Sequence, residues 1–323
     1  MPKPYTRTRM NRYLVIISGG RGERFWPVSR LTRPKQLLPI VGDTPMLAQT
    51  LERVGDLVPP ENIFIITNIE QRDACIEVAP QVPAEQIVGE PMGRDTAAAV
   101  ALAALLVERK DPQGVFSVLP ADAVIHDAPG FRGVLSAAYA EAAQEDVLVT
   151  IGIQPDNPAT GYGYLQRGEQ AAEAEGQPVY KVKRFVEKPD LPTAEEYLAS
   201  GDYFWNAGMF VWSVPSLSKA LGEHVPGLLA AVKAIGADLD SGTPLDEALA
   251  GHYPGLEKIS IDYALMERPT TWSACNRLSI GMMWANGRRS PAITPPTPRA
   301  TSFAATPSWP RVAATSSSPK AAT

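Results

Sequence analysis

The stretch YLVIISGGRGERFWPVSRLTRPKQLLPI, residues 13–40, joins an apolar run to a glycine-rich, basic loop. Its first five residues are typical of a buried β-strand. Gly19, Gly20 and Gly22 let the backbone adopt positive φ and approach a ligand closely, so that successive amides can point at a phosphate. Arg24 and Lys35 add the positive charge that such an anion needs. The stretch therefore predicts a strand that ends at an anion-binding loop.

Strand-like runs alternate with helical patterns through the first half of the chain. The expected strands are 13–17, 62–67, 85–88, 114–120 and 146–153, and the expected helices are 45–57, one from about 71, 95–109 and 131–143. This alternation predicts a Rossmann-like, doubly wound α/β fold with a mostly parallel sheet. Ligands of such sheets bind beyond the carboxyl ends of the strands, so the loops that follow strands carry the information on function.

The second half is less regular and reads as a smaller insertion. Its strand-like runs include GYGYLQ, VYKVKRFVEKP and DYFWNAGMFVW. Such an insertion commonly closes over the cleft of the sheet and carries the specificity for a second substrate. We therefore expect one domain over 10–268, with a nucleotide-binding part at about 10–153 and a second-substrate part at 154–268.

Composition excludes several classes of protein. The net charge is −5, from 30 basic and 35 acidic side chains, so no overall positive field would attract nucleic acid or a membrane surface. The 2 cysteines and 3 scattered histidines form neither a disulfide framework nor a zinc motif. The longest apolar run, residues 97–107, is too short to span a bilayer. We expect a cytoplasmic protein, and the sequence leaves a homodimer open.

Two common phosphate-binding motifs fail on this loop. A dinucleotide fingerprint needs a third glycine where Phe25 stands, which disfavours a Rossmann oxidoreductase. A Walker A loop needs Gly-Lys followed by Ser or Thr, which is absent here.

The pattern that remains is Gly-Gly-x-Gly-x-Arg followed by Pro27, Ser29-Arg30 and Pro34-Lys35-Gln36. This pattern resembles the signature of the sugar-1-phosphate nucleotidyltransferases and is closest to that of the mannose-1-phosphate guanylyltransferases. Further blocks follow in the family's order: GEPMGRDTAAAVALAA, VLPADAVI, GIQPDNPATGYGYLQ, FVEKPD, FWNAGMFVW and SIDYALME. Three positions depart from the family: Ser18 replaces Ala, Asp95 replaces Asn, and Ala123 replaces a common His.

The resemblance implies a reaction in which a sugar-1-phosphate oxygen attacks the α-phosphorus of a nucleoside triphosphate and pyrophosphate leaves. GTP and mannose 1-phosphate are the implied substrates, and Mg²⁺ is the implied cofactor. The loop amides and Arg24 would hold the triphosphate, Lys35 would bridge the reacting phosphates, and Asp122, at a strand end, would coordinate Mg²⁺.

The resemblance also implies two flanking groups of residues. Glu90, Arg94 and Asp95 would lie near the base, where a carboxylate can accept from the N1–H and N2–H of guanine. The residues for the sugar and its phosphate would be Gly161, Tyr162, Gly163, Glu187, Lys188 and Asn206.

The composition changes at Arg268. All 35 acidic residues lie at or before Glu267, and residues 269–323 are crowded with Pro, Ser, Thr and Ala, which predicts a disordered tail. In this family a second Mg²⁺-binding Asp belongs to a Trp-x-Asp-Val-Gly-x-Trp block that the chain lacks.

The genetic code offers a test of why the block is missing. Codons for residues 280–287, IGMMWANG, read from each third base, force Asp-Val-Gly and are compatible with Trp two positions before it and two positions after it. The hypothesis is that the tail from about residue 269 is a frameshifted or mis-sequenced translation of an ordinary family C-terminus.

Two other functions stay open at this point. The chain could use a different base or sugar. It could also be a catalytically impaired nucleotide-binding protein, since as written it keeps one metal carboxylate and lacks the other.

Overall fold

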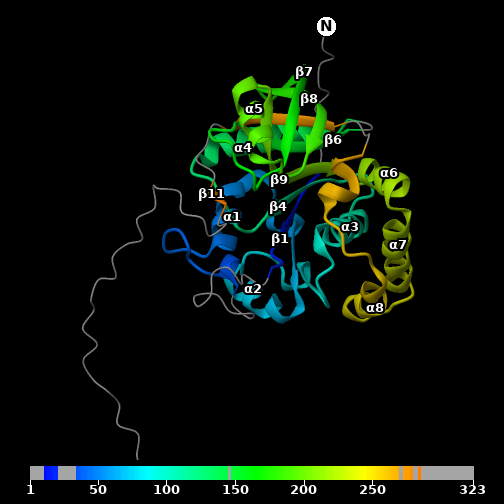
Figure 1. Cartoon of the computed structure of the whole chain (residues 1–323). Coiled ribbons are helices and arrows are strands. Elements are labelled where there is room, and N and C mark those ends of the chain that lie inside the picture. The colour runs from blue at the N-terminus through cyan, green and yellow to red at the C-terminus, as the bar shows by residue number, and fades with distance from the viewer. Residues whose placement is uncertain (1–10, 21–33, 145–146, 269–271, 279–282, 285–323) are drawn as a thin grey trace, which may run out of the picture. The chain divides into compact units, whose positions relative to one another are not determined.

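The computed structural model describes residues 11–20, 34–144, 147–268, 272–278 and 283–284. Strands and helices alternate through its first half (Figure 1). The strands there are β1 (Arg12–Ile17), β2 (Ile63–Asn68), β3 (Ile87–Glu90), β4 (Val115–Pro120), β5 (Ala123–Val124) and β6 (Leu148–Ile153). The helices between them are α1 (Met46–Val54), α2 (Arg72–Val78), α3 (Asp95–Glu108) and α4 (Ala128–Ala142). Each expected element of this half is present, with ends that differ from the expectation by a few residues.

The second half adds three long strands and four helices. The strands are β7 (Tyr164–Ala174), β8 (Gln177–Val186) and β9 (Tyr203–Ser213), and the helices are α5 (Leu191–Ser200), α6 (Val214–His224), α7 (Pro226–Asp240) and α8 (Leu245–His252). Two further strands, β10 (Trp272–Leu278) and β11 (Met283–Trp284), lie beyond Arg268.

One large sheet joins both halves of the chain. Its strand order is β3-β2-β1-β4-β9-β6-β10-β8-β7. The adjacent strands β3, β2, β1 and β4 run parallel to one another, and β10 runs parallel to β6. Strand β9 is antiparallel to both β4 and β6. The α/β fold class is thus confirmed, and the first and second parts of the chain share this sheet because β9 lies between β4 and β6.

Alternation along β1 divides the core into two layers. Leu14 and Ile16 belong to one buried cluster, and Tyr13 and Val15 belong to the other, because successive side chains of a strand point to opposite faces. The first cluster includes side chains of α1, α2, α4 and α5, and the second includes those of α3, α6, α7 and α8. A sheet covered on both faces requires continuous apolar strands, which explains the run YLVII.

Helix α3 is apolar around most of its circumference. Every residue from Ala97 to Val107 is buried, since the sheet lies on one side of the helix and α6 and α7 on the other (Figure 1). The apolar run of residues 97–107, which is too short to span a bilayer, is therefore part of a core helix. Within the residues that the structure describes, no helix combines the length and apolar character needed to cross a membrane.

Strand β10 corrects the prediction of a disordered tail. That prediction is wrong for Trp272–Leu278, which pair with β6 on one side and β8 on the other. The pairing uses backbone groups, and Ser273 and Ala274 are small enough to be buried in the sheet. The prediction used the average composition of residues 269–323, which does not represent this short, proline-free segment.

Candidate functional site

The basic residue and the carboxylate predicted for the reacting phosphates lie in direct contact. Lys35 lies on the short 3₁₀-helix Lys35–Leu37, and Asp122 follows the carboxyl end of β4. Lys35 Nζ forms an ion pair with Asp122 Oδ2, and each side chain is 20% exposed. The sheet thus brings together, at its carboxyl end, a cation and an anion that are far apart in the sequence.

A buried polar network holds the start of the glycine-rich loop. Gln36 Nε2 donates to the carbonyl of Ser18 at 2.6 Å, and Thr67 Oγ1 donates to the same carbonyl at 3.2 Å. Gln71 accepts from both Gln36 and Thr67 at 3.3 Å. Gln36 therefore ties the end of the signature stretch to its beginning, a role that its place beside Lys35 did not reveal. Gly22 and Arg24 lie outside the described residues.

Asp122 can contribute one carboxylate to a Mg²⁺ site. Among the described residues no three His, Cys, Asp or Glu side chains form a metal-binding group. Mg²⁺ is commonly held by one or two carboxylates together with phosphate oxygens and water, so a partly exposed Asp122 suits the smallest such set. The residues fit Mg²⁺ that arrives with a phosphate ligand.

Glu90 lies at the carboxyl end of β3, close to the loop. Its side chain is 7% exposed and accepts from Tyr253 Oη at 3.1 Å. A Cβ added to Gly19 would lie 3.8 Å from Glu90 Oε2, so the backbone of Gly19 runs beside the carboxylate. Burial raises the pKa of Glu90 to about 7, the hydrogen bond from Tyr253 opposes that shift, and the charge of Asp95 adds to it. Glu90 is thus a nearly dehydrated acceptor.

Arg94 and Asp95 shape the start of α3. Arg94 Nε donates to the carbonyl of Tyr253 at 3.0 Å, and its Nη2 donates to that of Pro254 at 2.5 Å. Asp95 has φ +66°, a left-handed conformation that Asn and Asp tolerate better than most residues, and its carboxylate accepts from Thr96 N at 2.8 Å. The backbone therefore accounts for Asp where the family has Asn, and Arg94 holds the segment that carries Tyr253.

The predicted sugar-phosphate residues gather around the first residues of β7 and the middle of β9. The backbone N–H of Asn206 donates to the carbonyl of Gly163 at 2.7 Å, and Tyr162 packs against Trp205 with ring centroids 5.0 Å apart. A Cβ on Gly163 would lie 2.6 Å from Glu187 Oε2, so only glycine permits this approach. Lys188, at φ +46°, forms an ion pair with Glu187. Around Gly161 a Cβ would meet nothing within 4 Å.

Thr150, Tyr253 and Asp262 also contact predicted site residues, although the sequence did not predict them for the site. Asn206 Nδ2 donates to Asp262 Oδ1 at 2.9 Å, and Thr150 Oγ1 donates to Asn206 Oδ1 at 3.1 Å. Tyr253 contacts Glu90 as described above. Asp262 stands in the SIDYALME block, which resembles the family but did not reveal which of its side chains faces the site.

One segment connects the two ends of the site. Tyr253 reaches Glu90, the N–H of Ile261 donates to Thr96 Oγ1 at 2.8 Å, and Asp262 accepts from Asn206. The chain from Tyr253 to Asp262 therefore runs from the residues predicted for the base to those predicted for the sugar.

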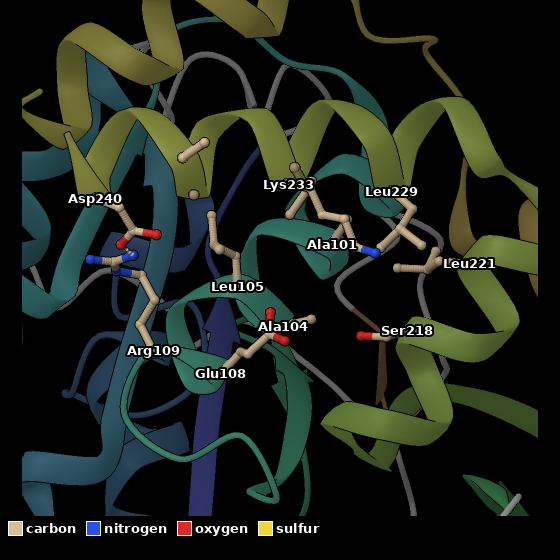
Figure 2. Close-up of a pocket in the computed structure, with 13 residues that line it drawn as sticks. Ala101, Ala104, Leu105, Glu108, Arg109, Ser218, Leu221, Leu229, Lys233 and Asp240 are labelled. Carbon is tan, nitrogen blue, oxygen red and sulfur yellow. Dashed lines mark hydrogen bonds and ion pairs between the residues drawn. The ribbon is translucent and has the colours of Figure 1, made fainter.

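A separate cavity of about 350 Å³ lies between α3, α6 and α7 (Figure 2). Its walls are mostly apolar, with Leu105, Leu221 and Leu229 among them, and Arg109 and Asp240 form an ion pair of 2.6 Å at one end. None of the predicted site residues lines it. The proposed chemistry does not use this cavity.

Comparison with known proteins identifies the family of the chain. The nucleotidyl transferase family profile matches residues 13–241. A mannose-1-phosphate guanylyltransferase of Escherichia coli K12 is 41% identical over 266 residues, which cover 79% of this chain and 54% of the relative. The xanthan biosynthesis protein XanB of Xanthomonas campestris pv. campestris B100 is 41% identical over 259 residues, 79% of this chain and 53% of the relative. The chain thus spans about half the length of these curated relatives.

A solved structure from Thermus thermophilus has a similar fold. It is described as a mannose-1-phosphate geranyltransferase and has a TM-score of 0.71 and 34% identity, covering 82% of this chain and 74% of that one. The resemblance predicted from the signature stretch is confirmed, and the chain belongs to the nucleotidyl transferase family.

Proposed function

We propose that the chain transfers GMP from GTP to mannose 1-phosphate, giving GDP-mannose and pyrophosphate with Mg²⁺ as cofactor. The observation that carries the proposal is the contact between Lys35 and Asp122. Glu90, predicted for the base, is buried, and Glu187 and Asn206, predicted for the sugar, both lie against Gly163. Relatives of about 40% identity named mannose-1-phosphate guanylyltransferase support this choice of substrates.

The residues have distinct tasks in the proposed reaction. In phosphoryl transfer the protein mainly aligns two anions and neutralises their charge, and it forms no covalent bond to them. Lys35 neutralises charge on the reacting phosphates, and Asp122 holds Mg²⁺, which stabilises the negative charge of the transferring group when bound. Amides of Gly19 and Gly20 face the triphosphate, and Glu90 accepts from guanine. Glu187, Lys188 and Asn206 orient mannose 1-phosphate.

A pyrophosphate-release assay tests the proposal. GTP, mannose 1-phosphate and Mg²⁺ are supplied together, with parallel reactions in which ATP, UTP or dTTP replaces GTP. Release with GTP above the other nucleotides supports the proposal, and preference for another nucleotide favours a different member of the family. Binding of GTP without release identifies the impaired nucleotide-binding protein.

Substitution of Glu90 should separate nucleotide binding from stability. The folded-state pKa of about 7 lies above the ordinary value of 4.5, so the stabilising contribution of protonated Glu90 is lost as pH rises through 7. Glu90→Gln should therefore stabilise the protein by roughly 1–3 kcal/mol above pH 7 and progressively less toward pH 5. The same change should weaken GTP binding roughly 10-fold to 100-fold, since a charged acceptor is lost.

Denaturant unfolding at pH 5.5, 7 and 8.5, with calorimetric titration of GTP, measures both effects. Glu77→Gln, at an exposed position of α2, is the matched control and should change neither. An unchanged GTP affinity in Glu90→Gln would remove Glu90 from the base site.

Substitution of Gly163 should affect the sugar end alone. A methyl group there would meet the Glu187 carboxylate and the Phe185 ring at 2.6–2.7 Å and displace them. We expect Gly163→Ala to weaken binding of mannose 1-phosphate roughly 10-fold to 100-fold, as displacement of a positioning group by about 1 Å does, and to leave GTP binding unchanged. Gly227→Ala, where a Cβ meets nothing within 4 Å, is the control. Equal affinities of the two variants for mannose 1-phosphate would contradict this role of Glu187.

A further inference from the structure

Asn206 has a side chain whose orientation is determined by its partners. Its Oδ1 accepts from Thr150 Oγ1 at 3.1 Å and from Gly208 N at 3.2 Å. With the carbonyl oxygen engaged by two donors, the amide nitrogen must point to the other side, where it donates to Asp262 Oδ1 at 2.9 Å. Asp262 therefore helps to fix the side-chain orientation of Asn206, a residue predicted for the sugar.

Asp262 brings a second carboxylate to the sugar end. It begins the π-helical turn Asp262–Met266, and its side chain is half-buried beside Glu187 and Lys188. Burial, and then the negative charge of Glu187, raise the pKa of Asp262 to about 6, while Lys188 and the hydrogen bond from Asn206 act in the opposite direction. Two neighbouring carboxylates are best satisfied by additional donors, which the hydroxyl groups of a sugar supply.

We propose that Asp262 is a specificity-determining residue of the sugar-phosphate site: one carboxylate oxygen holds the amide of Asn206, and the carboxylate together with Glu187 accepts hydrogen bonds from sugar hydroxyls. The inference rests on the proposed function, whose substrate is mannose 1-phosphate. A site built to accept from a hydroxyl discriminates strongly against an analogue that lacks it, because the buried acceptor is left unpaired.

Asp262→Asn tests the inference without removing the contact to Asn206. The carbonyl oxygen of the new amide can still accept from Asn206 Nδ2, whereas the negative charge and the second acceptor are lost. We expect mannose 1-phosphate to bind roughly 10-fold to 100-fold more weakly and GTP to bind unchanged. Since the folded-state pKa of Asp262 is raised, the variant should be at least as stable as wild type at pH 8, which separates the loss from misfolding.

Deoxy analogues of mannose 1-phosphate identify the hydroxyl. In calorimetric titration of the full wild-type chain, at least one analogue that lacks a single hydroxyl should bind more weakly than mannose 1-phosphate. For the Asp262→Asn variant, the affinity for that analogue and the affinity for mannose 1-phosphate should differ by less than about twofold. Asp240→Asn, an exposed carboxylate of α7 paired with Arg109, is the control and should bind every ligand as wild type does.

The outcomes distinguish the inference from the proposed function. A wild-type chain that binds GTP but no mannose 1-phosphate overturns both the proposed sugar and the role of Asp262. A wild type that binds mannose 1-phosphate, with an Asp262→Asn variant of equal affinity and equal response to every analogue, overturns the inference alone.

Discussion

Restoring the shifted reading frame from about residue 269 should raise the rate of pyrophosphate release by roughly 10²-fold to 10³-fold, the usual contribution of one charge-stabilising group in a phosphoryl-transfer site. The chain as written has no acidic residue beyond Glu267, so Asp122 has no partner carboxylate from that segment. The hidden reading supplies an Asp across the codons of Met282 and Met283. Steady-state kinetics of both chains with GTP, mannose 1-phosphate and Mg²⁺ measure the change.

The fold gives a reason for that expectation. Strand β11 pairs the backbone of Met283 with Val124 and that of Trp284 with Ala123, next in sequence to Asp122. A carboxylate introduced at this point of the chain would therefore lie on the strand beside the segment that follows Asp122. Residues 279–282 and 285–323, which hold the rest of the hidden block, lie outside the described residues.

One control separates the carboxylate from the restored fold. In the frame-restored chain, replacement of the new Asp by Asn should return turnover toward that of the present chain while leaving the midpoint of unfolding nearly unchanged. Equal turnover of the present and restored chains would contradict the two-carboxylate interpretation. Resequencing of the gene tests the origin of the tail, and an intact frame with no displaced GATGTGGGC would reject the frameshift.

Lys35→Ala should lower kcat of the frame-restored chain by roughly 10²-fold to 10³-fold. Lys35 Nζ contacts the carboxylate that is proposed to hold Mg²⁺, so in the proposed reaction its charge would lie beside the transferring group, which becomes more negative in the transition state. An effect on the transition state lowers kcat and kcat/KM together, whereas loss of simple substrate binding raises KM alone. Measurement of kcat and KM for both substrates distinguishes these cases.

Lys181→Ala provides the comparison for Lys35. Lys181 forms an exposed ion pair with Glu169 at 2.7 Å on β8 and β7, and its loss should change neither constant. A Lys35→Ala variant with unchanged kcat would remove Lys35 from the reacting phosphates and leave the ion pair with Asp122 a purely structural contact.

Much of the candidate site could be predicted from the sequence, because short motifs there carry residues that the backbone must place together. Lys35 and Asp122 were predicted for one chemical step and meet in an ion pair. The three residues Gly163, Glu187 and Asn206 were predicted for one ligand, and the first lies against the other two. Arg94 was predicted near the base, and its guanidinium donates to the carbonyls of Tyr253 and Pro254, on the segment whose Tyr253 side chain contacts Glu90.

Asp262, Tyr253 and Gln36 could not be assigned from the sequence for a common reason. Each acts through a partner that lies far along the chain: Asn206, Glu90 and Ser18. An aspartate, a tyrosine or a glutamine with no partner in view is compatible with an ordinary surface or core position. The identity of a hydrogen-bond partner depends on the distance between elements, which no local pattern records.

The sequence by itself determined the elements of the first half, because apolar periodicity acts over a few neighbouring residues, and its glycine content predicts an anion-binding loop after the first strand. Only the tertiary structure decided that β9 lies between β4 and β6, and that β10 from the acid-free tail lies between β6 and β8. Strand pairing joins backbone groups that every residue except proline can supply in full, so the order of strands follows from packing of the two core layers over the whole domain and not from any one segment.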